Sequence, residues 1–250
     1  NRPRGMRKGT APPGAATAAQ ASQRVRGKFG RIAPRSDTLN HLLSMNVDRY
    51  WRGRTVRRVR DALNRPAATV LDLCCGTGDL TIALARASEG SAVLGSDFCH
   101  PMLVQAGRKL SAQRLARRIF ESDALKLPVR DGSLDLITVA FGFRNLVDYR
   151  AGLREFQRVL KPGGTAAILE FSQPPNALFA AVYNFYSRRV LPVLGGWISG
   201  SRDAYTYLPE SVSKFPGAEE LAAEMRKMGF QDVEFTRMTG GVVALHIGKV

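Results

Sequence analysis

The stretch VLDLCCGTGDL, residues 70–80, combines an apolar run, an acid and a glycine turn. The letters VLDL predict a buried strand, and TIALARA, which begins at Thr81, predicts a helix. Between them, Gly76-Thr77-Gly78 forms a turn that lets the backbone approach a ligand closely, because glycine lacks a side chain. A glycine turn where a strand gives way to a helix indicates a nucleotide-type pocket.

Strand-like and helix-like segments alternate beyond this turn. We predict strands at residues 92–98, 118–124, 134–141 and 164–172, and helices at 101–116 and 149–160. A last helix, 216–228, has Pro216 in its first turn and Gly229 as its stop, and strands 232–239 and 242–250 then flank Gly240-Gly241 as a hairpin. This order predicts an α/β fold with a parallel sheet wrapped by helices on both faces. A parallel sheet that ends in an antiparallel hairpin is the Rossmann-like layout of the class I methyltransferases.

The segments outside the alternation define the domain organisation. Residues 1–27 are rich in Ala, Pro, Gly and Arg, and we expect a disordered basic tail. An acid-free start also has transit-peptide character, which leaves an organellar protein as the alternative. Residues 28–250 are expected to form one methyltransferase domain, with helices of a lid in residues 28–65. The apolar segment 174–215 is expected to be an insertion that binds substrate, with a buried core helix as the alternative.

The composition limits the partners and the compartment. The formal charge of +16 indicates an anionic partner such as nucleic acid, acidic lipid or a charged substrate. Residues 1–36 supply nine of these sixteen charges, so the remaining chain is only mildly basic. Three cysteines make no disulfide framework or zinc site, and no apolar run has the roughly 20 residues that span a bilayer. We therefore expect a cytoplasmic protein without a metal.

The acid in the opening stretch indicates the ligand. A dinucleotide site needs GxGxxG facing a pyrophosphate, and this loop has only two glycines. Asp72 precedes the turn, where it can meet a cationic amino-acid ligand. S-adenosylmethionine carries an ammonium and a sulfonium and has no phosphate, so it fits this loop.

Two further strands also end in acids. Asp97 ends the second strand and can accept hydrogen bonds from ribose hydroxyls. Asp123, followed by Ala124, ends the third strand and can receive the adenine amino group. A single acid at a strand end often only caps a helix, but three around one glycine loop predict an S-adenosylmethionine site. The predicted cofactor-binding residues are Asp72, Gly76, Thr77, Gly78, Asp97, Asp123 and Ala124.

The remaining reactive side chains have no predicted chemical role. Cys74 and Cys75 have no histidine within the same motif to activate them, so we expect small buried fillers. The three histidines are scattered, and His246 is expected to be structural.

Three stretches resemble one family. RVLKPGGTAAILEFS, residues 158–172, is similar to the second signature of the ubiquinone/menaquinone biosynthesis C-methyltransferases, and FGFRNL (141–146) and YTYLPESVSKFP (205–216) extend the similarity. The resemblance covers about residues 28–250. Ser36 stands where the family usually has Tyr, Asp48 where it often has His, and Ala140 where relatives can carry Ser.

The resemblance implies methyl transfer to a ring carbon of a reduced prenylated quinone. Demethylmenaquinol is the expected substrate, and the benzoquinol of the ubiquinone pathway is the alternative. Arg144 with Asn145 is expected to polarise a quinol oxygen, because arginine is a poor base but stabilises a phenolate. Tyr205 and Tyr207 are expected to contact the ring, or else to be ordinary half-buried aromatics.

The expected partners follow from this substrate. They are the lipophilic quinol, an anionic membrane surface that the protein contacts peripherally, and a second copy in a possible homodimer. No nucleic acid is expected, since no aromatic-basic recognition motif is present. A methyltransferase acting on RNA or another small molecule stays open, as does a non-catalytic cofactor-binding subunit of a quinone-biosynthesis complex.

Overall fold

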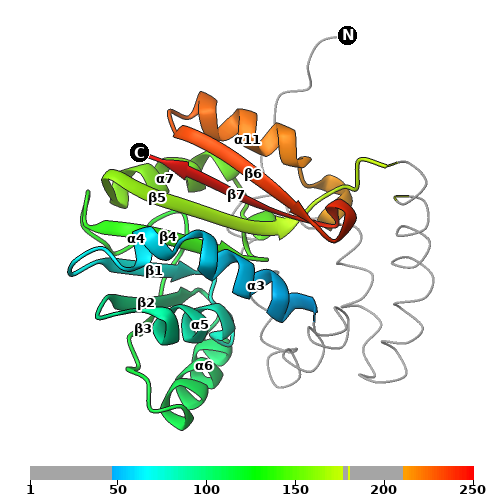
Figure 1. Cartoon of the computed structure of the whole chain (residues 1–250). Helices are drawn as coiled ribbons and strands as arrows, with labels where there is room; N and C mark the ends of the chain where they lie inside the picture. Colours follow the sequence, from blue (N-terminus) through cyan, green and yellow to red (C-terminus); the bar gives the residue numbers. More distant parts are fainter. Residues whose placement is uncertain (1–46, 177–179, 181–210) are drawn as a thin grey trace, which may run out of the picture.

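The computed structural model describes residues 47–176, 180 and 211–250, which build one seven-stranded sheet (Figure 1). The strand order is β3-β2-β1-β4-β5-β7-β6. The strands are β1 (Thr69–Leu73), β2 (Ala92–Asp97), β3 (Ile119–Glu121), β4 (Leu134–Ala140), β5 (Leu160–Phe171), β6 (Gln231–Met238) and β7 (Val243–Lys249). Each predicted strand is present.

Strand directions confirm the predicted class I layout. The pairs β1–β2, β1–β4, β2–β3 and β4–β5 are parallel. Strand β7 pairs antiparallel with both β5 and β6. The last strand of the chain therefore lies between β5 and β6, so the hairpin does not simply extend the sheet outward.

Helices follow the predicted alternation. They are α3 (Val47–Arg58), α4 (Arg60–Leu63), α5 (Asp79–Ala87), α6 (His100–Ala112), α7 (Tyr149–Val159) and α11 (Ala218–Lys227), with 3-10 turns η2 (Phe143–Asn145) and η4 (Thr239–Gly241). The predicted start of the last helix is wrong by two residues. Gly217 is its N-cap, and its N–H donates to Glu220 at 3.2 Å, which places Pro216 before the helix. Gly229, with φ 96°, ends it as predicted.

Alternate residues of the central strands face two separate cores. Leu71 and Leu73 of β1 pack on the side of α7 and α11, whereas Val70 packs on the side of α3, α4 and α5 (Figure 1). Both faces are therefore covered, and the ends of the strands are the places where ligands can reach the sheet.

The described part of the N-terminal helices belongs to the second core. Trp51 of α3 is buried, and its indole N–H donates to the Thr239 hydroxyl at 2.9 Å. This bond ties α3 to η4, next to the start of β7. Residues 28–46, with Ser36, lie outside the described residues, so a lid formed by residues 28–65 stays a prediction. The tail 1–27, Tyr205, Tyr207 and most of the segment 174–215 lie outside them as well.

None of the described helices combines the length and hydropathy needed to cross a bilayer.

Candidate functional site

The carboxyl ends of the parallel strands meet at one edge of the sheet, on the right of Figure 1, toward which the β5 arrow points. The glycine loop follows β1 at this edge, Asp97 ends β2, and residues 141–145 follow β4. All predicted site residues within the described part of the chain lie at or next to this edge. The topology thus brings the candidate cofactor and catalytic residues together.

The glycine loop needs left-handed backbone. Gly76 has φ 54° and Gly78, the N-cap of α5, has φ 84°, both in the region that side chains rarely adopt. A Cβ on Gly76 would meet nothing within 4 Å, so its backbone faces open space. That space above the loop is where a ligand can approach the main chain.

Asp72 lies beneath the loop. Its carboxylate accepts hydrogen bonds from the hydroxyls of Thr81 at 2.6 Å and Thr138 at 2.9 Å, which tie α5 and β4 to β1. Burial raises the pKa of Asp72 to about 6, although the two hydroxyls act to lower it. The described contacts of Asp72 are thus structural, and direct contact with a ligand ammonium stays a prediction.

Asp97 joins β2 to the glycine loop. One carboxylate oxygen accepts from the N–H of Gly76 and the other from the N–H of Cys99, both at 2.9 Å. Burial raises the pKa of Asp97, while these backbone donors act to lower it. Each oxygen has a second lone pair, so the carboxylate can also accept from ribose hydroxyls. The arrangement fits the sugar of S-adenosylmethionine beside the loop.

Asp123 and Ala124 follow β3 at the same edge. The Asp123 carboxylate accepts from the N–H of Leu125 at 2.9 Å and is exposed, whereas Ala124 is buried. The hydroxyls of Ser122 and Ser96 lie 2.6 Å apart and join the ends of β3 and β2. An exposed acid beside a buried alanine suits an adenine ring with one polar edge, and this assignment stays a prediction.

The paired cysteines are packed against glycines. Cys74 has φ 54°, and a Cβ on Gly142 would lie 2.3 Å from its Cβ; one on Gly95 would lie 3.2 Å from the Cys75 sulfur. Both cysteines are half-buried, and loss of solvation raises the pKa of each thiol well above its usual value. Such thiols are poor nucleophiles, in line with the filler role.

Arg144 is buried after β4, in the 3-10 turn η2. Its Nη1 donates to the Glu170 carboxylate at 2.8 Å and also to the Phe141 carbonyl oxygen. The guanidinium carbon lies 5.2 Å from the centre of the Phe171 ring. Asn145 is half-buried beside it. The predicted catalytic arginine is therefore held firmly at the carboxyl edge.

Three aromatic rings form a cluster at this edge that the sequence did not reveal. The ring centres of Phe141 and Phe171 lie 4.9 Å apart, and that of Trp51 lies 5.8 Å and 6.2 Å from them. The guanidinium of Arg52 lies 5.8 Å from the Phe141 ring centre. The rings come from α3, the end of β4 and the end of β5, and only the fold brings them together.

Asp79 is a further residue next to the loop that was not among the predicted site residues. It is the first residue of α5, directly after the loop, and it forms ion pairs with Lys109 and, at 3.8 Å, with Arg52. Lys109 also lies 3.3 Å from the Thr77 hydroxyl. Its position directly after Gly78, the second glycine of the turn, is the signal in the sequence that could have identified Asp79.

Within the described residues, no three His, Cys, Asp or Glu side chains are grouped as a metal site requires. The Nε2–H of His246 donates to the Ala218 carbonyl at 2.8 Å, and burial lowers the pKa of His246 to about 4. A buried neutral histidine that links β7 to α11 agrees with the expected structural role.

The fold and this edge define a class I S-adenosylmethionine-dependent methyltransferase. A SAM-dependent methyltransferase from Aquifex aeolicus has the same fold, with 20% identity, TM-score 0.56, and coverage of 78% of this chain and 89% of that one. Geranyl diphosphate C-methyltransferase from Streptomyces coelicolor A3(2) is 15% identical, with TM-score 0.55 and coverage of 78% and 77%. At these identities the likeness concerns the fold alone.

The chain belongs to the ubiE/COQ5 methyltransferase family, whose sequence model matches residues 17–250. A demethylmenaquinone methyltransferase of Thermus thermophilus is 50% identical over 220 residues, 88% of this chain and 98% of that protein. A ubiquinone/menaquinone biosynthesis C-methyltransferase of Geobacter sulfurreducens is 43% identical over 235 residues, 92% and 90% of the two chains. The predicted family, enzyme class and cofactor are confirmed.

Proposed function

We propose that this methyltransferase acts on the ring carbon of a reduced prenylated quinone, with demethylmenaquinol as its substrate. The names of the relatives from Thermus and Geobacter support this substrate class. The observation that carries the proposal is the buried guanidinium of Arg144, which lies at the same strand edge as the Asp97 loop and next to aromatic rings. A site with a fixed cation and apolar walls suits a planar, oxygen-bearing ring.

The residues around the loop hold the cofactor in this proposal. S-adenosylmethionine supplies an electrophilic methyl group on its sulfonium when bound. Asp97 accepts from the ribose hydroxyls, and Asp123 with Ala124 receives the adenine. The backbone of residues 76–78 would hold the amino-acid portion, and Asp72 would supply negative charge to it. Together these residues would hold and orient the cofactor.

Arg144 prepares the nucleophile. A quinol ring carbon becomes strongly nucleophilic when a neighbouring hydroxyl loses its proton, and a guanidinium stabilises the resulting phenolate without acting as a base. Asn145 and Tyr205 orient the ring by hydrogen bonds. The role of Tyr205 rests on the family resemblance alone. Reaction needs the ring carbon at about 3–3.5 Å from the methyl group, so orientation supplies much of the rate.

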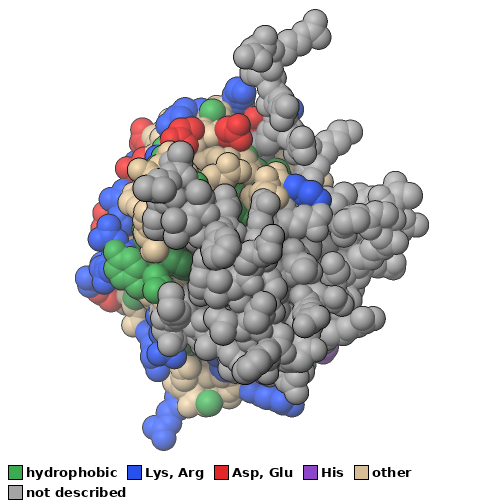
Figure 2. Space-filling model, turned by 90° about the vertical axis from the view of Figure 1, so that its right-hand side faces the viewer, with side chains coloured by type: hydrophobic (Ala, Val, Ile, Leu, Met, Phe, Trp, Pro, Cys, Tyr) green, Lys and Arg blue, Asp and Glu red, His purple; other side chains and the backbone are tan. Residues whose placement is uncertain are grey.

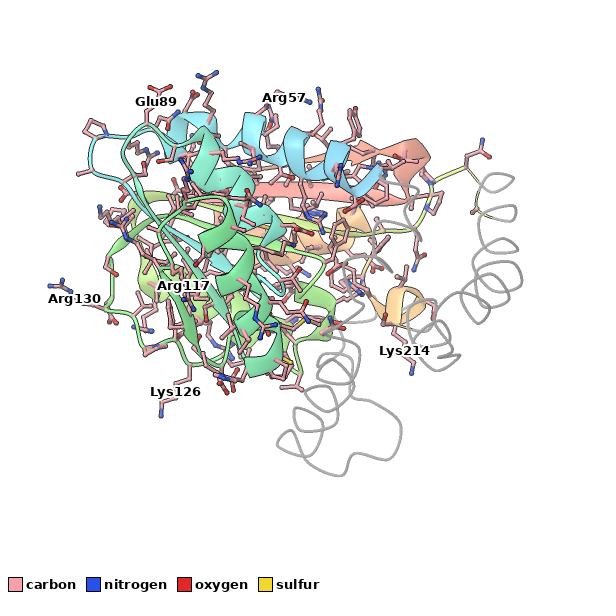
Figure 3. The ribbon with its side chains drawn as sticks, turned by 90° about the horizontal axis from the view of Figure 1, so that it is seen from below. Arg57, Glu89, Arg117, Lys126, Arg130 and Lys214 are labelled. Atoms are coloured by element: carbon pink, nitrogen blue, oxygen red, sulfur yellow. The ribbon has the colours of Figure 1, made fainter. Side chains whose placement is uncertain are left out.

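The lipophilic substrate requires access from a membrane. Helix α3 exposes Arg49 and Arg57, with Tyr50 53% exposed between them, and no acid among the described residues pairs with either arginine. Figure 3 shows Arg57 pointing away from the ribbon, and Figure 2 shows further basic side chains around the described surface. Basic residues near anionic lipid contribute about 1 kcal/mol each, and tyrosine favours the membrane interface.

We propose that this face contacts the cytoplasmic membrane surface peripherally, and that residues 174–215 bind the isoprenoid tail. A homodimer stays a prediction.

The proposal is tested by supplying purified protein with S-adenosylmethionine and vesicles that contain either reduced demethylmenaquinone or the corresponding benzoquinol. We expect a product methylated on the ring carbon from the reduced naphthoquinone, and none from its oxidised form. Methylation of neither quinol, combined with cofactor-dependent methylation of RNA, would instead support the RNA alternative.

A further inference from the structure

We propose that Glu170 is a positioning residue for methyl transfer, because it fixes both the backbone and the side chain of Arg144. This inference rests on the proposed role of Arg144 toward the quinol oxygen. Glu170 lies near the end of β5 and is fully buried, and Arg144 is 26 residues earlier, after β4.

The Glu170 carboxylate accepts three hydrogen bonds. Its Oε1 accepts from Arg144 Nη1 and from the N–H of Phe171, each at 2.8 Å, and its Oε2 accepts from the N–H of Arg144 at 3.1 Å. One carboxylate thus sets where the η2 turn begins and where the guanidinium points.

Other groups also contact Arg144 and restrict its position. The Phe141 carbonyl accepts from Nη1, and Nε lies 3.4 Å from the Ser211 hydroxyl. The Tyr149 hydroxyl donates to the Arg144 carbonyl oxygen at 3.0 Å. The Phe171 ring centre lies 5.2 Å from the guanidinium carbon. Hydrogen bonds thus hold the edge of the guanidinium, and the Phe171 ring packs against its face.

Stability alone gives a weak reason for this pair. Both side chains of this ion pair are almost wholly buried, 8% exposed for Arg144 and 0% for Glu170. Such pairs often contribute little net stability, because desolvation offsets the attraction. We therefore explain the burial of this pair by its effect on orientation: Glu170 holds the Arg144 guanidinium in place at the carboxyl edge of the sheet.

A control of the same chemical kind exists between α11 and α7. Glu224 of α11 is also buried, and its carboxylate pairs with Arg150 of α7, whose side chain is 48% exposed. Glu224→Gln therefore removes one buried negative charge next to an arginine, as Glu170→Gln does, at a carboxylate that pairs with Arg150 and not with Arg144.

The experiment compares Glu170→Gln, Glu170→Asp and Glu224→Gln with the full-length parent, measuring thermal unfolding, S-adenosylmethionine Kd, and kcat and KM with reduced demethylmenaquinone. Glutamine loses the charge, and aspartate keeps the charge but is one methylene shorter. We expect both Glu170 variants to keep the cofactor Kd within about threefold while kcat falls about tenfold or more, as for a weakened oxyanion donor. Glu224→Gln is expected to change stability and leave kcat within about twofold.

A double-mutant cycle adds a measurement that a purely structural role would not affect. Because Glu170 acts through Arg144, Glu170→Gln introduced into Arg144→Lys should lower kcat by about twofold at most. The inference is overturned if the two substitutions multiply, if both Glu170 variants turn over at the parent rate, or if Glu224→Gln loses kcat equally. A parent that methylates neither quinol contradicts the proposed function, whereas an active parent with unaffected Glu170 variants contradicts this inference alone.

Discussion

The carboxylate of Asp97 accepts a hydrogen bond from the N–H of Gly76 at 2.9 Å, so the end of β2 is fastened to the loop that follows β1. The same carboxylate accepts from Cys99, directly before α6. One buried acid thereby sets the position of the loop that we propose faces the cofactor. A substitution at Asp97 changes the shape of the site as well as its charge.

The first prediction is that Asp97→Asn weakens S-adenosylmethionine binding by about 1.5–3 kcal/mol, the range for hydrogen bonds to a charged group. Titration calorimetry measures this directly. Asp135→Asn is the matched control, since Asp135 is also buried and accepts from Thr69 N–H at 2.9 Å and Lys161 Nζ at 2.7 Å, at the start of β4. Equal losses of affinity in both variants would show that Asp97 acts only through stability.

The second prediction concerns the close packing of Gly142 against Cys74. An alanine at 142 would place its Cβ 2.3 Å from the Cys74 Cβ, so Gly142→Ala should destabilise the fold by about 1–3 kcal/mol. Cys74→Gly should restore most of that loss in the double variant, because φ 54° suits glycine and the clash disappears.

Denaturant unfolding measures these differences. Gly53→Ala in α3, where an added Cβ meets nothing within 4 Å, is the control and should gain about 0.5–1 kcal/mol. A double variant that is no more stable than Gly142→Ala would contradict the steric explanation.

The third prediction concerns pH and two buried groups with opposite effects. The pKa of His246 falls to about 4 through burial, so the unfolded chain binds a proton first and stability decreases as pH falls from about 6.5 toward 4. The pKa of Asp72 rises to about 6 through burial, so the folded chain binds a proton first and stability increases as pH falls from about 6 toward 4.

The two contributions partly cancel between pH 6 and pH 4. Asp72→Asn removes the stabilising contribution of Asp72 protonation. Between pH 7 and pH 5 the free energy of unfolding of this variant should therefore fall by about 1 kcal/mol more than that of the parent. The free energy of unfolding of His246→Gln should fall by less than that of the parent. Urea titrations at the two pH values provide the comparison. A stability difference between Asp72→Asn and the parent that is the same at both pH values would contradict the raised pKa.

The sequence predicted the strands and helices well because their periodicity is local. The placement of β7 between β5 and β6 was not predictable, since alternating hydropathy identifies the buried face of a strand but not its neighbour. Strand β5 begins at Leu160, four residues before the predicted Gly164, because Leu160 pairs with Leu134 across an irregularity in the register. That pairing is a tertiary contact.

The site was predictable in part for the same reason. Asp97 and the glycine loop were found from their spacing, because strand ends in a parallel sheet share an edge. Glu170 was visible within a family motif, but its pairing with Arg144 depends on adjacent strand ends. The cluster of Trp51, Phe141 and Phe171 joins segments far apart in the chain, and no local pattern reveals it.

The central claim is that Arg144 stabilises the phenolate of the quinol in the transition state. Arg144→Ala alone leaves the buried Glu170 carboxylate without its cationic partner, and breaking a buried ion pair in this way typically costs about 3–5 kcal/mol. Arg144→Met with Glu170→Gln avoids this, because glutamine keeps an acceptor for the backbone and neither side chain is charged.

The deciding measurement is single-turnover methyl transfer to reduced demethylmenaquinone by the parent, Arg144→Lys and the Met/Gln double variant, with S-adenosylmethionine binding measured in parallel. We predict cofactor affinity within about threefold, a rate about a hundredfold or more lower in the double variant, and partial retention with lysine, which keeps the charge without the planar fork. A double variant that transfers the methyl group at the parent rate, or whose defect is explained by lost cofactor binding, would contradict the account.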